Sequence, residues 1–477
     1  MIALDPTAET APPAAPATPA AADLDLALLL KYDRPGPRYT SYPTAPQFST
    51  DTAVAALTSE LAGESGDAAR PVSLYFHLPF CESRCWFCGC TTVITRRSDL
   101  ADDYLDTLER ELDLTRPHLN PASPVTQLHF GGGSPTFLAP AAIRRLGAMI
   151  HARHRFAPDV EASVEIDPRR LTPAQARAYA DLGCRRASLG VQDTNTRVQL
   201  AIHRVQPLEQ TLDAFAMLRD AGYASIGVDL IYGLPYQTAE TFARTLDDVI
   251  ALGPERLAVF SYAHVPWLKP AQRILERDRA LPTPEAKLGL FLLALRRLTA
   301  AGYVHIGMDH FARPDDELAV AQRSGRLQRN FQGYSTRAGA SIHAFGLSSI
   351  SQTGRSYRQN IRDLDAYQAA VAAGRLPIER GLILTDEDAR RREIILRLMC
   401  DRRLDFAALS ARLGVDFEKT YSAELTGLAD LVADGLLARV PGGYDVTPTG
   451  ALLIRVIAMR FDAYLGTGGP ARYSRTV

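Results

Sequence analysis

Short apolar runs alternate with longer amphipathic stretches between residues 71 and 310. The apolar runs predict strands at Val72–His77, Thr126–Phe130, Ala162–Asp167, Arg186–Val191, Ile226–Ile231, Leu257–Tyr262 and Tyr303–Gly307. The stretches between them predict helices at Asp99–Thr115, Ala141–Arg155, Thr172–Leu182, Leu208–Ala221, Ala239–Leu252 and Pro284–Ala301. Such alternation is typical of parallel strands joined by right-handed crossovers. It predicts an α/β fold, either a partial (β/α)6 TIM-like barrel or a doubly wound open sheet.

The residues before this region differ from it in composition and lack its alternating pattern. Residues 1–22 are rich in Ala, Pro and Thr without an apolar period, so we expect a disordered tail there. Residues 23–70 form an N-terminal segment in which Leu30–Thr44 combines Tyr and Arg with prolines that prevent a long helix. This extended stretch is either a surface loop or part of a binding region.

A second change of texture, near residue 370, separates the predicted barrel at 71–370 from a mostly helical C-terminal domain at 371–477. We expect helices there at Leu382–Cys400, Phe406–Leu413, Glu424–Asp434 and Pro448–Asp462. The apolar runs Leu436–Val440 and Gly443–Val446 predict a wing-like hairpin.

Composition narrows the class of protein. The 477 residues are 46% hydrophobic and carry a formal net charge of -1, so the basic footprint of a nucleic-acid-binding protein is missing. No apolar run approaches the ~20 residues that span a bilayer, and the N-terminus lacks the pattern of a secretory signal. We therefore expect a soluble, cytoplasmic protein and a monomer.

Four of the six cysteines crowd into one loop after the first predicted strand, with the spacing Cys81-x3-Cys85-x2-Cys88-x-Cys90. Tight, irregular spacing suits thiolates that wrap an iron–sulfur cluster, and three ligands would leave one iron open. The alternative is zinc bound by all four thiols, but zinc sites usually combine two separated pairs. Cys184 and Cys400 lie in apolar surroundings and are expected to be buried structural thiols.

Polar and glycine residues follow several predicted strands. The strand at Thr126–Phe130 runs into Gly131-Gly132-Gly133-Ser134, which either forms a turn or lets a ligand approach the backbone. Because strand ends meet at the mouth of a parallel barrel, we expect a shared site there. Its further candidates are Glu165, Asp167, Gln192, Asp229 and the potential carboxylate partner Arg204.

The motif Cys81-x3-Cys85-x-Phe87-Cys88 resembles the signature of the radical S-adenosylmethionine superfamily. The resemblance implies that Cys81, Cys85 and Cys88 bind three irons of one 4Fe–4S cluster, while S-adenosylmethionine chelates the fourth. An electron from the cluster would then release methionine and a 5′-deoxyadenosyl radical. Gly132 and its neighbours resemble the superfamily's segment for the methionyl amino group.

Longer motifs resemble the oxygen-independent coproporphyrinogen III oxidase (coproporphyrinogen dehydrogenase) family over the chain from about Leu28 onward. They are Tyr32–Thr44, the four-cysteine loop, Gly190–Asp193, Asp229–Pro235, Gly307–Glu317 and Asn330–Tyr334. The resemblance implies anaerobic decarboxylation of two propionates of coproporphyrinogen III to the vinyl groups of protoporphyrinogen IX. The radical would abstract hydrogen from the propionate β-carbon, and an electron donor and an acceptor of unknown identity would take part.

The same resemblance implies two bound S-adenosylmethionine molecules. The cluster-bound copy would contact Tyr75, Gly132, Glu165, Ala263 and Ile350. The second copy would contact Phe87, Gly133, Ser134, Gln192, Arg204 and Asp229. On the first strand, alternation places Tyr75 on the same face as His77, in agreement with a catalytic, site-facing Tyr75.

Three questions stay open at this stage. The main rival function is a haem chaperone paralogue, which typically lacks the Arg/Tyr-rich segment and the fourth cysteine, and a radical enzyme acting on another tetrapyrrole is a further possibility. Arg34 and Arg38 are candidates for holding substrate propionates. Cys90 is either a thiol packed beside the cluster or a participant in electron or proton transfer.

Overall fold

The computed structural model describes residues 26–64, 70–465 and 473–476. The predicted disordered tail, residues 1–22, lies outside the described residues. Six parallel strands form the centre of a 12-stranded sheet and pair in chain order. They are β1 (Val72–Leu78), β4 (Val125–Gly132), β5 (Phe156–Ile166), β6 (Arg186–Gln192), β7 (Ser225–Tyr232) and β8 (Arg256–Ser261). β13 (Ser341–Phe345) continues the parallel series on the other side of β1.

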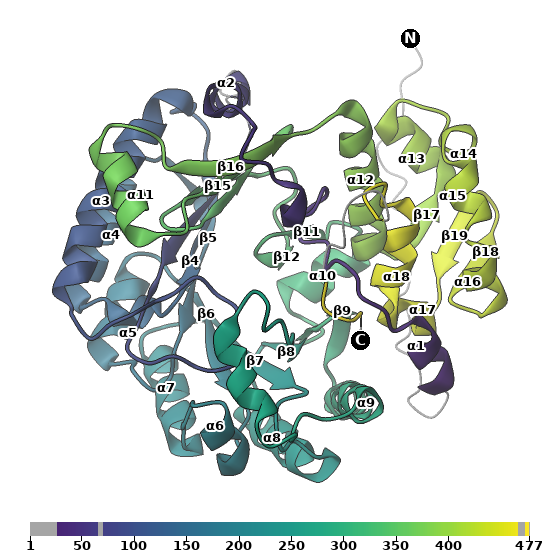
Figure 1. Ribbon diagram of the computed structural model, residues 1–477, viewed down its shortest axis with the longest axis horizontal. Coiled ribbons are helices and arrows are strands. Elements are labelled where there is room, and N and C mark those ends of the chain that lie inside the picture. Colours follow the sequence, from purple (N-terminus) through teal and green to yellow (C-terminus); the bar gives the residue numbers. More distant parts are fainter. Residues whose placement is uncertain (1–25, 65–69, 466–472, 477) are drawn as a thin grey trace.

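The connecting helices lie along the outer side of this curved sheet (Figure 1). They are α3 (Asp99–Thr115), α4 (Pro140–His151), α5 (Pro173–Asp181), α6 (Thr196–Ala201), α7 (Leu208–Asp220), α8 (Ala239–Leu252) and α9 (Pro284–Ala300). Strand order never reverses between β1 and β8, as it would in a doubly wound sheet. The prediction of a partial barrel is therefore confirmed.

Antiparallel strands extend the sheet at both ends. β14 (Ile350–Gln352), β15 (Ser356–Asn360) and β16 (Ile378–Ile383) follow β13. At the other end, β10 (His310–Ala312) lies between β8 and β9 (Val304–Gly307) and pairs antiparallel with both. The predicted strand at Tyr303–Gly307 thus forms, but it is not a direct neighbour of β8. The sequence pattern does not predict β10 and β13–β15, because short strands carry a weak periodic signal.

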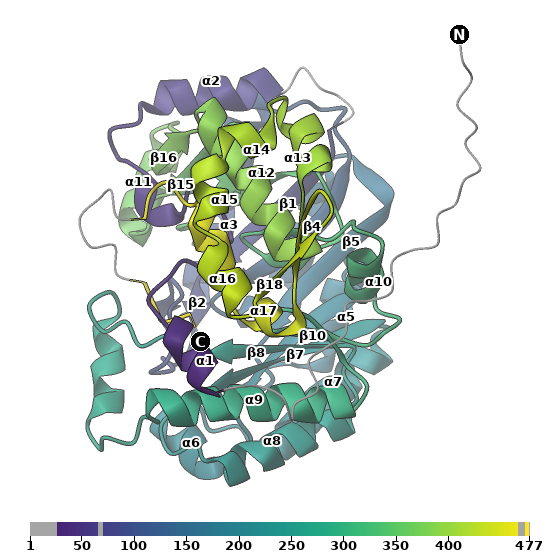
Figure 2. The same ribbon diagram turned by 90° about the vertical axis from the view of Figure 1, so that its right-hand side faces the viewer.

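The C-terminal part is mostly helical and carries the expected wing, and it faces the viewer in Figure 2. α12 (Asp386–Asp401) leads into β17 (Arg403–Asp405), which α13 (Phe406–Leu413) follows. β17 forms a small sheet with β19 (Gly443–Val446) and β18 (Leu437–Val440). Between α13 and β18 the chain forms three short helices, which are α14 (Phe417–Thr420), α15 (Ser422–Thr426) and α16 (Ala429–Ala433). The main sheet continues to β16, beyond the change of texture near residue 370, and α12 therefore begins later than the predicted Leu382.

The predicted helix Pro448–Asp462 is wrong as one element. It consists of α17 (Pro448–Leu452), α18 (Ile454–Ala458) and the 3-10 turn η6 (Met459–Phe461). Leu453 breaks the helical path, with φ -108° and ψ 22°. The predicted helix Glu424–Asp434 is likewise divided, because Gly427 and Leu428 separate α15 from α16.

The N-terminal segment lies between the barrel and the C-terminal helices. It contains α1 (Leu26–Tyr32), the 3-10 turn η2 (Ala45–Gln47) and α2 (Val54–Glu64). Pro35 pairs with Arg475 near the C-terminus, and Ser49 pairs with Gly381 of β16. Among the helices of the described ranges, none combines the length and apolar character needed to cross a membrane.

Candidate active site

The cysteine loop leaves the barrel at the carboxyl end of β1. Cys81 lies in β2 (Phe80–Cys81), which pairs with β3 (Val93–Ile94). Further along the loop, the backbone N–H of Trp86 donates to the Ile202 carbonyl at 3.0 Å. Cys81, Cys85 and Cys88 are half-buried, and Cys90 is exposed. The loop therefore stands at the end of the barrel where the active sites of this fold class lie.

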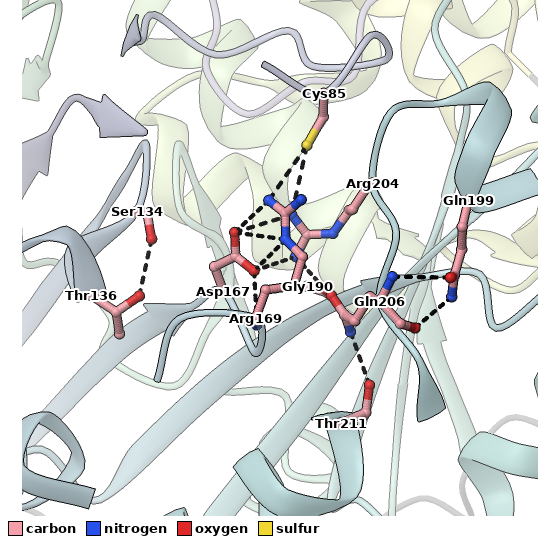
Figure 3. Close-up of polar contacts among 10 residues, drawn as sticks. All are labelled: Cys85, Ser134, Thr136, Asp167, Arg169, Gly190, Gln199, Arg204, Gln206 and Thr211. Atoms are coloured by element: carbon pink, nitrogen blue, oxygen red, sulfur yellow. Dashed lines mark hydrogen bonds and ion pairs between the residues drawn. The ribbon is translucent and has the colours of Figure 1, made fainter. Parts of the chain in front are cut away.

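Two guanidinium groups lie beside Cys85 (Figure 3). Arg204 Nη1 is 3.7 Å and Arg169 Nη2 is 3.9 Å from the Cys85 sulfur. Both arginines also bind Asp167, with Arg204 Nη2 at 3.1 Å and Arg169 Nη2 at 2.7 Å from its carboxylate oxygens. Burial alone would raise the pKa of Asp167, but the two guanidiniums lower it to about 2. Both cations thus place positive charge beside the sulfur of a candidate metal ligand.

The donor set fits an iron–sulfur cluster. Cys81, Cys85 and Cys88 present three thiols from one loop, next to positive charge that would offset an anionic cluster. In the described part of the chain, no three His, Cys, Asp or Glu side chains converge in the manner of a single-ion site. Cys184 and Cys400 are buried, as predicted.

The side chains of Cys90 and Cys88 are joined by a hydrogen bond. A hydrogen bond from the Cys90 thiol lowers the pKa of Cys88 to about 6. The same hydrogen bond raises the pKa of Cys90 well above its usual value. Of these two thiols, Cys88 is therefore the one that gives up its proton more readily.

A cavity of about 300 Å³ opens beside Cys90. It brings together four residues predicted to bind S-adenosylmethionine: Tyr75, Gly132, Glu165 and Ile350. The Gly132 N–H donates to Glu165 Oε2 at 3.1 Å. Gly132 has φ +116°, and a Cβ there would lie 2.7 Å from the His77 ring. Only glycine fits this position.

Histidines that sequence analysis did not select organise this cavity. The Tyr75 ring stacks on His129, with centroids 5.7 Å apart, and the Tyr75 hydroxyl lies 3.2 Å from His77 Nδ1. His129 Nε2 lies 3.4 Å from Glu165 Oε1. Burial would raise the pKa of Glu165, but the hydrogen bond and charge of His129 lower it. Glu165 is thus a carboxylate suited to a ligand ammonium group. Alternation along β1 and β4 provides the only sequence signal for these histidines.

Two further residues predicted to bind S-adenosylmethionine, Gln192 and Asp229, lie on the neighbouring barrel strands β6 and β7. Asp229 lines a second cavity of about 210 Å³ together with Glu165, and it accepts from the Ser188 hydroxyl at 2.9 Å. Burial raises the pKa of Asp229 to about 7. Gln192 is buried with φ 70°, next to Gly190, whose carbonyl accepts from Arg204 Nη2 at 2.6 Å.

The remaining predicted contacts lie around the cysteine loop. The Gln272 side chain donates to the carbonyls of Phe87 and Ala263, at 3.0 and 3.2 Å. Ala263, predicted for the cluster-bound copy, therefore lies close to Phe87, predicted for the second. Gln272 belongs to a 3-10 segment, η5 (Pro270–Glu276), and had no sequence signal.

The residues after Gly132 are packed as tightly as Gly132 itself. A Cβ on Gly133 would lie 2.6 Å from the Pro79 carbonyl carbon, a backbone atom that cannot move aside like a side chain. The buried Ser134 hydroxyl lies 3.0 Å from that of Thr136.

Arg34 and Arg38 occupy different environments. Arg38 forms an ion pair with Asp309, and its guanidinium lies 5.8 Å from the centre of the Phe260 ring. Arg34 is exposed, and its backbone N–H donates to the Thr476 hydroxyl at 3.1 Å. The buried Arg329 donates to the Arg38 carbonyl at 3.2 Å and so fixes this segment. Arg38 therefore faces the barrel, whereas the Arg34 backbone is tied to the C-terminus.

Comparisons with known proteins agree with this geometry. The radical SAM superfamily model matches residues 75–249, and the HemN C-terminal domain model matches residues 384–453. Oxygen-independent coproporphyrinogen III oxidases from Salmonella typhimurium and Escherichia coli are 46% and 45% identical over 93% of this chain and 96% of theirs. The solved coproporphyrinogen III oxidase (HemN) of Escherichia coli, described as a radical SAM enzyme, is 43% identical. It superposes with a TM-score of 0.87 and covers 93% of this chain and 99% of its own.

Proposed function

This chain belongs to the oxygen-independent coproporphyrinogen III oxidases, and from this premise we propose which of its residues carry the reaction. The chain decarboxylates two propionate side chains of coproporphyrinogen III oxidatively, giving the vinyl groups of protoporphyrinogen IX in haem biosynthesis. When bound, a 4Fe–4S cluster and S-adenosylmethionine supply a 5′-deoxyadenosyl radical that takes hydrogen from the propionate β-carbon.

Cys81, Cys85 and Cys88 are the proposed cluster ligands. Arg204 and Arg169 place positive charge beside Cys85, where it would offset the charge of an anionic cluster, and Asp167 holds both guanidiniums in place. Cys90 lies outside the proposed ligand set.

The cavity beside Cys90 is the proposed site of the first S-adenosylmethionine. Glu165 faces the ligand ammonium group, Gly132 lets the ligand approach the backbone, and Tyr75 and Ile350 line the walls. A second copy is proposed near Phe87, Ser134, Gln192, Arg204 and Asp229. The buried carboxyl of Asp229 and the Arg204 guanidinium would give that copy one acidic and one basic partner.

A substrate with four carboxylates needs cations around a water-poor site. Arg38 is the proposed propionate partner, because its present partner Asp309 shows that an anion fits beside it. Arg34 is proposed to order the same segment through its contacts with the C-terminus. A cytoplasmic monomer, supplied by a separate electron donor and acceptor, completes the proposal.

One observation carries the assignment of residues. Cys90, at the end of the cysteine loop, and the polar ends of β1, β4 and β5 line a single cavity. The test is anaerobic reconstitution of the cluster, addition of coproporphyrinogen III and S-adenosylmethionine, and identification of protoporphyrin after oxidation of the product. Stable haem binding without decarboxylation would instead support the chaperone function.

A further inference from the structure

A surface groove of about 530 Å³ lies on the outer side of the cysteine loop. Its walls come from the loop itself, from α6 and from the η5 segment, and its main residues are Trp86, Arg197, Leu200, Tyr236, Ile274 and Arg277. Leu200 exposes 63% of its surface. Trp86 lines the groove and follows Cys85, a proposed cluster ligand, directly in the chain.

The cysteine loop separates this groove from the proposed S-adenosylmethionine cavity. Cys90 lines the inner cavity, whereas Trp86 lines the outer groove, and the two hollows have no lining residue in common. A molecule bound in the groove could therefore approach the loop without entering the cavity where the radical forms.

Contacts with Ile202 and His203 hold Trp86 in place at the groove. The Trp86 ring stacks on His203, with centroids 4.9 Å apart and planes inclined by 22°. His203 Nδ1 lies 2.7 Å from the Arg84 carbonyl oxygen, and the Trp86 N–H donates to the Ile202 carbonyl at 3.0 Å. These contacts join the end of α6 to the cysteine loop, so that a docked molecule would stand at a fixed distance from it.

The charge around the groove is positive. Arg84, Arg197 and Arg277 are exposed at or beside it. The carboxylate of Asp278, which also lines the groove, accepts a hydrogen bond from the Tyr236 hydroxyl at 2.6 Å. An exposed leucine and a tryptophan bordered by arginines match a partner with an apolar contact patch and an acidic rim.

We propose that this groove docks the protein that reduces the cluster, a small acidic one-electron carrier. The inference rests on the proposed function, because only an enzyme that uses the cluster needs such a donor. The carrier loses one electron, the oxidised cluster held by Cys81, Cys85 and Cys88 gains it, and no bond or proton is exchanged. Electron transfer between proteins requires a close approach, which the groove beside Trp86 and Cys85 provides.

The test uses the reconstituted holoenzyme and a purified bacterial flavodoxin as the acidic carrier. Leu200→Glu and Arg277→Glu place negative charge in the groove, and Leu212→Glu on α7 is the matched control, with 47% of its surface exposed outside the groove. The dissociation constant of flavodoxin and the rate at which reduced flavodoxin bleaches the cluster are measured for each. We expect both groove variants to bind about tenfold or more weakly and to be reduced correspondingly more slowly. The Leu212→Glu control should resemble the wild type.

Dithionite, a small reductant that needs no docking surface, separates the two proposals. Cluster reduction and turnover driven by dithionite should be unchanged in Leu200→Glu. Equal or absent flavodoxin binding in wild type and Leu200→Glu overturns the docking inference. So does a wild-type dimer in sedimentation that Leu200→Glu dissociates, since the groove would then join two copies. If the wild-type enzyme showed no turnover with dithionite, that result would instead contradict the proposed function.

Discussion

The guanidinium of Arg204 lies 3.7 Å from the sulfur of Cys85. The same side chain is buried and also binds Asp167, which helps to hold the guanidinium beside the thiol. A fixed positive charge next to a proposed cluster ligand stabilises the more negative, reduced state of the cluster.

Replacing Arg204 should make the cluster harder to reduce. In Arg204→Met, we expect the reduction potential to fall by on the order of 60 mV, equivalent to about 1.4 kcal/mol for one electron. Arg204→Lys keeps the charge and should recover part of the shift, although it loses the fork that binds Asp167. Redox titration followed by electron paramagnetic resonance gives the potentials. An unchanged potential in Arg204→Met would refute this role.

A methyl group at Gly132 should block the cavity. The Cβ of Gly132→Ala would meet the His77 ring, and φ +116° is unfavourable for alanine. We expect S-adenosylmethionine binding to weaken at least tenfold, as measured by calorimetry on the reconstituted protein. Gly289→Ala in α9 is the control, because no atom lies within 4 Å of its new Cβ, and it should raise helix stability by about 0.5–1 kcal/mol. Equal affinities in the two variants would contradict the assignment.

The cysteines should fall into two groups. Serine at position 81, 85 or 88 should abolish the visible absorbance of the reconstituted cluster, whereas Cys184→Ser, at a buried site distant in sequence from the loop, should retain it. Cys90→Ser should also retain the cluster, since Cys90 follows the third proposed ligand by only two residues and is outside the ligand set. If Cys90→Ser lost the cluster while Cys88→Ser kept it, the ligand assignment would be wrong.

Stability of the metal-free protein should fall as pH rises because of Asp229. Burial raises its folded-state pKa to about 7, above the unfolded value of about 3.9. Between those two values the folded state binds more protons, so each pH unit costs up to about 1.4 kcal/mol through this group. Asp229→Asn should remove that contribution. Urea titrations at pH 5 and pH 7 measure it, and equal pH dependence in both proteins would exclude it.

Arg38 should matter more to substrate binding than Arg34. Arg38 faces the Phe260 ring and Asp309, whereas Arg34 is exposed. We expect Arg38→Met to raise the KM for coproporphyrinogen III about tenfold and Arg34→Met to change it less than threefold, since one charge-assisted contact is worth about 1.5–3 kcal/mol. Steady-state kinetics under anaerobic conditions decide this. Identical KM values in both variants would remove Arg38 from the substrate site.

The sequence was sufficient for the central strands and for the cysteine loop, because long periodic runs and clustered thiols are strong local signals. Helices such as Asp99–Thr115 were predicted to the residue. Short strands such as β14, which carries Ile350, were not found, since three residues show no clear period. Ile350 was selected only through family resemblance.

Residues that act through tertiary contacts were also missed. Gln272 binds the carbonyls of Phe87 and Ala263 from a 3-10 segment that follows β8, and nothing in its local sequence marks it. The groove beside Trp86 depends in the same way on α6 and η5 meeting the cysteine loop. Such sites follow from chain topology rather than from local pattern.

The central claim is that this chain decarboxylates coproporphyrinogen III by a radical reaction at the Cys81–Cys88 loop. Coproporphyrinogen III deuterated at the propionate β-carbons tests it most directly, with S-adenosylmethionine, dithionite and the reconstituted protein in the absence of oxygen. Deuterium should appear in 5′-deoxyadenosine as protoporphyrinogen IX forms, and Cys85→Ser should give neither product. Decarboxylation without transfer of the label, or labelled 5′-deoxyadenosine without a vinyl product, would contradict the account.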